Sequence, residues 1–138
     1  MAVYQSLQGN LGLGKAIEYF VSHNIPVSIP LNDTQSYDLV ADFNGKLQRV
    51  QVKTSRATEN GISYTVQLRN TGGNRTGNVR QVAFDNNSSD YLFIYTANEK
   101  IYLIPCQDID AKNSICVGNK YTEYEIQIKP FAEFIEEL

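Results

Sequence analysis

The sequence predicts a single α+β domain spanning residues 1–138, in which a mixed or antiparallel β-sheet is flanked by helices. Two segments with the helical spacing of apolar residues lie near the two ends of the chain. Between them, strand-like segments occur in pairs joined by short turns. No repeat or linker divides the chain, and 138 residues with 42% hydrophobic and 20% charged residues suit one domain with one core.

The two helices are predicted at residues 10–24 and from Pro130 to the C-terminus. Apolar residues in the first recur every three or four positions, at Leu13, Ile17, Phe20 and Val21. Those in the second do the same, at Phe131, Phe134, Ile135 and Leu138. This stripe is either core or a surface for a partner, and we expect it to belong to the core. Gly12 and Gly14 lower helix propensity, so we expect close packing, or the approach of a bulky group, at the start of the first helix.

The strands are predicted at residues 26–30, 37–43, 47–54, 62–68, 91–95, 101–105 and 123–128. A two-residue turn joins the second and third of these, and TANEK joins the fifth and sixth into another hairpin. A short turn or helix is expected near residues 105–111. Residues 70–78 have no apolar anchor and predict a loop.

Positive charge is concentrated in the middle of the chain, although the formal net charge is −3. Residues 44–82 hold seven of the 12 Lys and Arg residues and a single acid. Phosphate binding requires such a local basic surface. A solvated stretch whose charges are met by acids elsewhere in the fold fits the composition equally well.

The cysteines, the N-terminus and the one histidine indicate the cellular compartment and limit the possible catalytic chemistry. Cys106 and Cys116 form no CxxC motif, and we expect two buried thiols in a reducing cytoplasm. The N-terminus does not resemble a signal peptide, and no apolar stretch is long enough to span a membrane. Any His-based metal site or nucleophile would have to use His23, the one histidine.

Asn44-Gly45 lies between two alternating segments and predicts a hairpin with a type I′ turn. Phe43 then faces Lys46, and the numbers of paired residues sum to 89. Leu39 pairs with Val50 and Tyr37 with Val52, so one side of the ribbon is apolar and can cover the core.

The opposite side of this ribbon brings together a carboxylate, an amide and an ammonium group. Asp38 lies opposite Gln51, where cross-strand Cβ atoms are about 5 Å apart. Lys53 follows two residues later on the same face. Carboxylate and amide oxygens suit Mg²⁺, and a neighbouring ammonium can orient a water or stabilise a charged transition state. An Asp–Lys pair on a solvated sheet face explains the same pattern without a function.

The order and spacing of these residues resemble the PD-(D/E)XK nuclease superfamily. The matching elements are Glu18 within GLGKAIEYF, Asp38 within SYDLVADF and Gln51-Val52-Lys53 within RVQVKTS. DYLFIYTANEKIYLIP also resembles the later strands of the group I intron-encoded homing endonucleases. The resemblance implies a restriction-endonuclease-like core.

The resemblance further implies a metal-dependent, sequence-specific DNA endonuclease that hydrolyses phosphodiester bonds with Mg²⁺, which Mn²⁺ can replace. Asp38 would be the main metal ligand, with Gln51 and the backbone carbonyl of Val52 completing the set. Lys53 would serve the attacking water. Glu18 would be a secondary ligand or would orient a water.

Gln51 departs from the widespread form of the motif, which has Asp or Glu at this position. A neutral amide brings no charge, so either one metal is held well or Glu18 supplies the missing charge. A catalytically degraded nuclease-like domain that only binds DNA is an alternative. A junction-resolvase type of nuclease, acting on branched DNA, is another.

Recognition of double-stranded DNA would fall to the basic middle of the chain. The candidates are Arg49, Arg56, Arg69, Asn74, Arg75 and Arg80. Because so small a domain cannot cover a long target alone, cleavage of both strands implies a homo-oligomer, a dimer or a tetramer.

Overall fold

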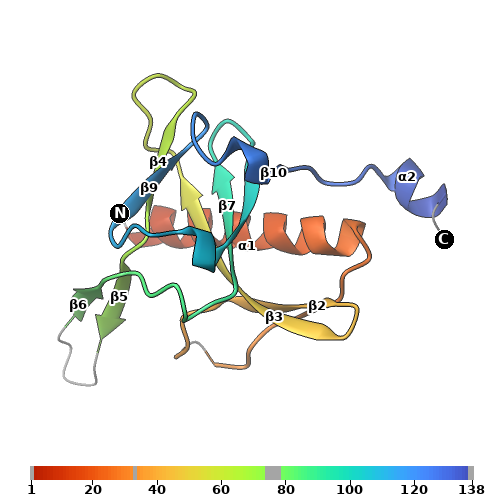
Figure 1. The fold of residues 1–138 in the computed structure, drawn as a ribbon, viewed down its shortest axis with the longest axis horizontal. Helices are drawn as coiled ribbons and strands as arrows, with labels where there is room; N and C mark the ends of the chain where they lie inside the picture. The colour runs from red at the N-terminus through yellow and green to blue at the C-terminus, as the bar shows by residue number, and fades with distance from the viewer. Residues whose placement is uncertain (1, 33, 74–78, 137–138) are drawn as a thin grey trace.

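The computed structural model describes residues 2–32, 34–73 and 79–136 (Figure 1). The helices are α1 (Ala2–Ser22), α2 (Phe131–Glu136) and the 3₁₀ turns η1 (Cys106–Asp108) and η2 (Thr122–Tyr124). The first strands are β1 (Val27–Ser28), β2 (Leu39–Phe43), β3 (Lys46–Ser55), β4 (Tyr64–Gln67) and β5 (Asn70–Gly73). The later strands are β6 (Val79–Val82), β7 (Tyr91–Thr96), β8 (Ile101–Pro105), β9 (Ser114–Val117) and β10 (Glu125–Ile126).

Six strands form a central sheet in the order β1-β2-β3-β7-β8-β10. β3 and β7 are parallel, and every other neighbouring pair in this sheet is antiparallel. The mixed sheet with flanking helices confirms the predicted fold class. β4 pairs with β9 and β5 pairs with β6 in two smaller antiparallel sheets.

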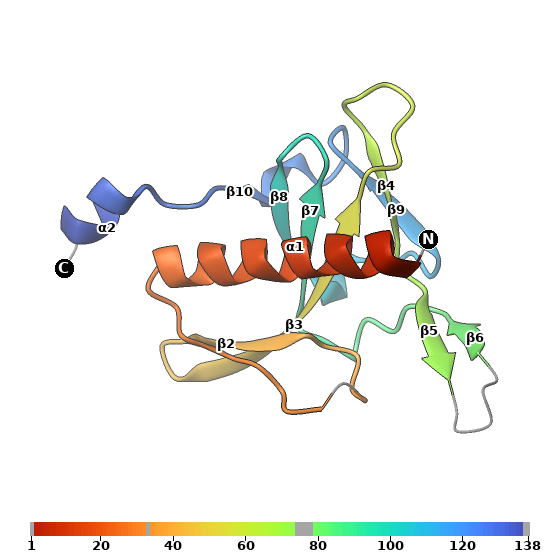
Figure 2. The ribbon, with the colours of Figure 1, turned by 180° about the vertical axis from the view of Figure 1, so that it is seen from behind.

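Helix α1 crosses one face of the central sheet, as the two opposite views show (Figures 1 and 2). Its buried residue Phe20 packs with Val50 of β3 and Phe93 of β7. Gly12 allows the close approach: a Cβ there would collide with the side chain of Thr54, whereas a Cβ on Gly14 would meet open space. Close packing is therefore confirmed for Gly12 and wrong for Gly14.

The opposite face of the sheet is covered by β4 and β9. Leu92 and Ile94 of β7 point to this side, where they pack with Tyr64 and Val66 of β4 and with Ile115 of β9. β3 alternates in the same way, so Val50 and Val52 face α1 while Gln51 and Lys53 face the second layer.

The structure corrects several expectations at the level of elements. α1 begins at Ala2 rather than at residue 10, and β9 has no counterpart in the predicted strands. β5 lies where a loop was predicted for residues 70–78, because its partner β6 supplies the backbone pairing that its own sequence does not signal. Residues 74–78 of that predicted loop fall outside the described part of the chain.

The two cysteines are not both buried as expected: Cys106 is buried and Cys116 is exposed, and both are free thiols. Burial raises the pKa of Cys106 to about 12. In the described chain, no helix combines the length and the hydropathy needed to cross a membrane.

Helix α2 lies at the end of an extended segment that leads away from the sheet (Figures 1 and 2). Phe131 is 76% exposed, so its expected place in the core is wrong. The side chains of Phe134, Ile135 and Leu138 lie outside the described part of the structure.

Candidate active site

The β2–β3 hairpin has the predicted register. Its pairs run from Phe43 with Lys46 to Leu39 with Val50, with residue numbers that sum to 89. Asn44 and Gly45 have φ values of 56° and 93°, as a type I′ turn requires. The turn chemistry therefore fixes which side chains of β3 share a face.

The ladder ends at the pair Leu39–Val50, and Asp38 immediately precedes β2. The Asp38 N–H donates to the Val50 carbonyl at 2.8 Å, and the Val52 N–H donates to Asp38 Oδ2 at 2.7 Å. The predicted pairings of Asp38 with Gln51 and of Tyr37 with Val52 are both absent from the ladder. The Asp38 side-chain carboxylate accepts from the Val52 N–H instead. This departure keeps the Asp38 carboxylate beside β3.

The three side chains predicted to lie together share a cavity of about 530 Å³. Asp38, Gln51 and Lys53 all line it, together with Val52. The remaining walls come from the segment before β2, from β5 and β6, and from the segment before β7, through Thr34, Gln35, Ser36, Asn70, Val82, Ala83, Asp85 and Ser88. The side chains that the hairpin geometry predicted to be neighbours thus open onto a common space.

Asn70, at the start of β5, connects Gln51 and Lys53. Its Oδ1 accepts from Gln51 Nε2 at 2.7 Å and from Lys53 Nζ at 3.0 Å. Gln51 is 3% exposed, and its Oε1 has no hydrogen-bond partner within the described ranges. A buried acceptor without a partner is costly, so this oxygen is a candidate ligand atom.

Burial moves both ionisable groups of the site toward their neutral forms. Burial raises the pKa of Asp38, against the opposing effects of the Val52 N–H and the positive charge of Lys53. Burial lowers the pKa of Lys53, against the attraction of Asp38. An additional positive charge beside Asp38 would favour its carboxylate form.

The oxygen atoms at this cavity fit a hard divalent cation. They include the Asp38 carboxylate and Gln51 Oε1. The Val52 carbonyl joins them if, as is usual in a strand, it points to the same edge as the Val52 N–H that bonds to Asp38. Nowhere in residues 2–32, 34–73 and 79–136 do three or more His, Cys, Asp or Glu side chains form a metal-ligating group. One carboxylate with several waters is a common arrangement for Mg²⁺.

Glu18 is not part of this cavity. It stands on α1, which packs against the face of β3 opposite to Gln51 and Lys53. Its side chain is 56% exposed and pairs with Lys15 at 3.3 Å. The expectation of Glu18 as a secondary ligand is not supported by this placement, because the sheet lies between it and the cavity.

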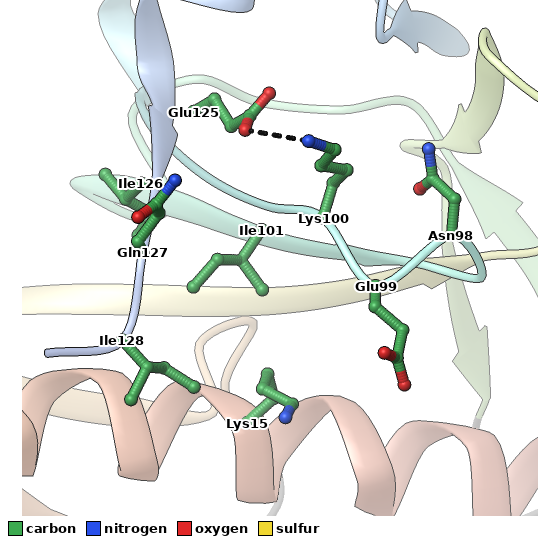
Figure 3. Close-up of a pocket in the computed structure, with 9 residues that line it drawn as sticks. All are labelled: Lys15, Asn98, Glu99, Lys100, Ile101, Glu125, Ile126, Gln127 and Ile128. Atoms are coloured by element: carbon green, nitrogen blue, oxygen red, sulfur yellow. Dashed lines mark hydrogen bonds and ion pairs between the residues drawn. The ribbon is translucent and has the colours of Figure 1, made fainter. Parts of the chain in front are cut away.

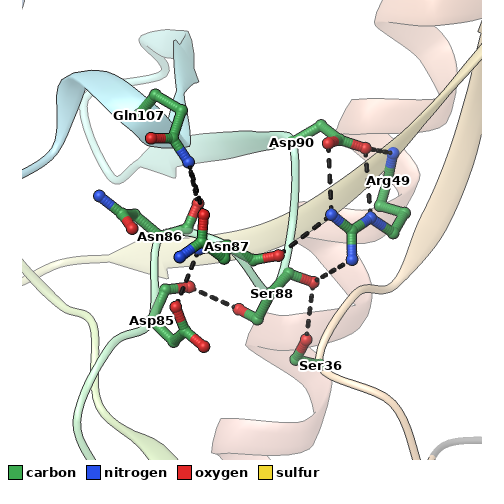
Figure 4. Close-up of polar contacts among 8 residues, drawn as sticks. All are labelled: Ser36, Arg49, Asp85, Asn86, Asn87, Ser88, Asp90 and Gln107. Carbon is green, nitrogen blue, oxygen red and sulfur yellow. Dashed lines mark hydrogen bonds and ion pairs between the residues drawn. The ribbon is translucent and has the colours of Figure 1, made fainter.

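Arg49 is engaged by several groups of the protein, although its side chain is 40% exposed (Figure 4). Its backbone N–H and its Nε donate to Asp90 Oδ2 at 2.7 and 3.2 Å. Its Nη atoms donate to the Ser88 and Asn87 carbonyls at 3.2 and 3.1 Å. Arg49 therefore ties β3 to the segment before β7, and its expected contact with DNA is not supported.

The other predicted DNA-binding residues are spread over two regions. Arg56 is exposed immediately after β3. Arg69 is half-buried, and its Nη1 donates to Asn113 Oδ1 at 2.8 Å. Arg80 belongs to β6, but its side chain is not described, and Asn74 and Arg75 lie outside the described residues.

A separate cavity of about 380 Å³ lies between α1 and the β8–β10 edge of the sheet (Figure 3). It is lined by Lys15, Glu99, Lys100 and Glu125, among others, and Lys100 pairs with Glu125 at 3.4 Å. Equal numbers of acids and lysines leave this cavity without a net charge that would select a phosphate or a cation. We assign it no role.

Sequence reasoning missed Asn70 and Asp90. Asn70 lies in a segment predicted to be a loop, and nothing in its local sequence signals that it reaches β3, 17 and 19 residues away along the chain. Asp90 precedes a predicted strand, a position typical of a capping residue. Each acquires its role only through a tertiary contact.

Comparisons with known proteins agree with this geometry. The sequence profile of the PD-(D/E)XK endonuclease family matches residues 4–136. No curated protein matches the chain significantly. Among solved structures, the chain is similar to a bacterial homing endonuclease, I-Ssp6803I, with a TM-score of 0.69 and 30% identity over 93% of this chain and 85% of that one.

The profile and the solved structure both describe endonucleases, which supports nuclease activity for this chain. The similar structure also confirms the restriction-endonuclease-like architecture expected from the sequence. Because the family profile covers nearly all of the residues, this chain belongs to the PD-(D/E)XK endonuclease family.

Proposed function

We propose that this chain is a metal-dependent, sequence-specific DNA endonuclease of the homing type. Its active site consists of Asp38, Gln51, Lys53 and the backbone of Val52. The observation that carries the proposal is the buried, unpartnered Oε1 of Gln51 in a cavity shared with a carboxylate and an ammonium group. Family membership and the likeness to a bacterial homing endonuclease support it.

Asp38, Gln51 and the Val52 carbonyl would hold one divalent cation, Mg²⁺ or Mn²⁺. Asp38 Oδ2 accepts the Val52 N–H, which holds the carboxylate in place and leaves Oδ1 for the cation. When bound, the cation would polarise the phosphoryl oxygen and lower the pKa of a water. Since Gln51 is neutral, Asp38 is the single negative charge that these side chains supply to the cation.

Lys53 acts on the phosphate side of the site. Its ammonium donates to Asn70 Oδ1 and keeps further N–H groups for the cavity. There it can hold the attacking water and stabilise negative charge that develops on the phosphoryl group. Removing the ammonium should therefore slow hydrolysis without preventing the cation from binding.

DNA binding is assigned to residues of the basic middle of the chain. Arg56 and Arg69 remain candidates from the described structure, and Asn74, Arg75 and Arg80 remain predictions. Arg49 is left out because Asp90, Ser88 and Asn87 occupy most of its donors.

The test is cleavage of DNA from the region around the protein's own gene, in versions with and without the intervening sequence that would carry it. We expect nicking in Mg²⁺, none in EDTA, and a preference for the uninterrupted version. Asp38→Asn and Lys53→Met should each lower the cleavage rate by at least about 100-fold while DNA binding persists. Glu18→Gln serves as the matched control and should cleave at the wild-type rate.

Cleavage that survives both Asp38→Asn and Lys53→Met would refute the assigned site. Absent cleavage with retained DNA binding would favour the degraded binding module instead. Metal-independent cleavage would refute the proposed metal site. Preference for four-way junctions over linear DNA would favour a resolvase-type substrate.

A further inference from the structure

We infer that Asn70 is a positioning residue of this site, whose side-chain oxygen fixes the orientation of the Gln51 amide so that Oε1 faces the bound cation. The inference rests on the proposed function, because it concerns the same metal site. Asn70 acts through its hydrogen bonds with Gln51 and Lys53.

The chemistry of the donors fixes which atom of each amide points where. The ammonium of Lys53 can only donate, so the Asn70 atom 3.0 Å from Nζ must be the oxygen, Oδ1. The same oxygen lies 2.7 Å from the Gln51 amide, so the Gln51 atom facing it must be the donor, Nε2. Gln51 Oε1 therefore has to occupy the opposite position on the amide, where it has no partner within the described structure.

A reversed Gln51 amide would be unfavourable on both sides. Its Oε1 would lie against Oδ1 of Asn70, which would place two acceptors in contact. Its Nε2 would point to the cation, which a hydrogen-bond donor cannot ligate. Without Asn70, the unfavourable contact between two acceptors is lost. Before the cation binds, the two orientations of the Gln51 amide then become comparable in energy.

The same argument accounts for the neutral residue at position 51. A Glu there would offer only acceptors, so Asn70 would have to turn its Nδ2 toward it. That turn would withdraw Oδ1 from Lys53. Gln51 and Asn70 are in this sense a matched pair, and Lys53 sets the polarity of both.

The placement of Asn70 makes the contact specific to the folded protein. Asn70 begins β5 and pairs with Val82 of β6, and Val82 and Ala83 line the same cavity. The short β5–β6 sheet therefore forms one wall of the site. From that wall, Asn70 bonds to β3 through Gln51 and Lys53.

Direct binding of Mn²⁺, followed by electron paramagnetic resonance without DNA, tests the inference. Asn70→Leu removes the oxygen at similar size and should weaken Mn²⁺ binding by about 10–100-fold. Asn70→Asp keeps an acceptor for both Gln51 and Lys53, and its Mn²⁺ affinity should be at least that of the wild type. Asn86→Ala is the matched control, since it removes an amide that bonds to the Ile109 carbonyl outside the cavity, and should leave the affinity unchanged.

A double-mutant cycle separates positioning from general destabilisation. If Asn70 acts through Gln51, then adding Asn70→Leu to Gln51→Leu should weaken Mn²⁺ binding no further. The side-chain amide protons of Gln51 should also exchange faster with solvent in Asn70→Leu, as NMR can follow. Thermal unfolding identifies variants that do not fold, and Asn70→Ala replaces Asn70→Leu in that case.

Wild-type Mn²⁺ affinity in folded Asn70→Leu, or fully additive losses in the cycle, would overturn the inference. The variant Asp38→Asn distinguishes failure of the inference about Asn70 from failure of the proposed function. If Asp38→Asn abolishes Mn²⁺ binding while Asn70→Leu does not change it, only the role of Asn70 is wrong. If Asp38→Asn binds Mn²⁺ as the wild type does, the proposed metal site is wrong and the inference falls with it.

Discussion

Single residues near the site are held by partners far away in the sequence, and Arg49 is the most fully engaged of them. Its guanidinium and its backbone N–H both reach Asp90, 41 residues away. Because β3 and β7 are adjacent and parallel, this contact joins the two strands just before their pairing begins at Val50 and Tyr91. The Arg49–Asp90 contact thereby holds in place the strand that carries Gln51 and Lys53.

The Arg49–Asp90 contact predicts a dependence of stability on acid. Burial raises the pKa of Asp90, but the hydrogen bonds and charge of Arg49 outweigh it and hold the pKa below its ordinary value. A depressed pKa stabilises the fold above the unfolded pKa of about 4, and this contribution is lost as the pH falls through the folded value. Asp90→Asn should lower the free energy of unfolding by about 1 kcal/mol at pH 7.

Urea unfolding of wild type and Asp90→Asn between pH 7 and pH 3 measures this dependence. The difference between the two proteins should shrink below pH 4, where Asp90 of the wild type becomes protonated. Asp85→Asn is a suitable control, because Asp85 accepts from the Asn87 N–H and makes no contact with Arg49. A difference that does not vary with pH would contradict the electrostatic role of Asp90.

At the scale of elements, the contact between α1 and β3 depends on one glycine. A Cβ on Gly12 would collide with Thr54, whose Oγ1 is held by a 2.8 Å hydrogen bond from Gln8 Nε2. A Cβ on Gly14, one half-turn further along α1, would meet nothing within 4 Å. The same substitution at the two positions should therefore have opposite effects.

Gly12→Ala should lower the free energy of unfolding by about 1–3 kcal/mol, because overpacking outweighs the gain in helix propensity. Gly14→Ala should raise it by about 0.5–1 kcal/mol, because the propensity gain has no steric cost there. Chemical unfolding of both variants beside wild type measures the two shifts. Stabilisation by both substitutions would show that α1 can move away from β3 at little cost.

At the scale of the whole molecule, one chain of 15.5 kDa carries one candidate site. Cutting both strands of DNA requires two such sites in opposite orientation, which a symmetric dimer supplies. We therefore expect sedimentation to give a mass of at least twice that of the chain, at the concentrations used for cleavage.

Mixing experiments extend this prediction to function. Wild-type protein mixed with an excess of Asp38→Asn should produce nicked rather than linear DNA, since most dimers then contain one working site. A mixture with an excess of Glu18→Gln should still produce linear DNA. A monomeric mass combined with double-strand cleavage would contradict the expected homo-oligomer.

Features that depend on residues close together in the sequence could be predicted, whereas features that depend on distant residues could not. The pairing of residues 39–43 with 46–50 follows from a two-residue turn, so the sequence alone determined that register and the shared face of Gln51 and Lys53. The basic middle segment and the strand pairs joined by short turns were likewise local signals.

Only the tertiary structure decided the rest, because those features join segments that no local pattern connects. It placed Asn70 against Gln51 and Lys53, tied Arg49 to Asp90, and set Glu18 behind the sheet. Sequence periodicity reports which side of an element is apolar, but not which distant element will cover it. The side chains of the hairpin that share a face could therefore be predicted from the sequence, whereas the other walls of the cavity arise from packing.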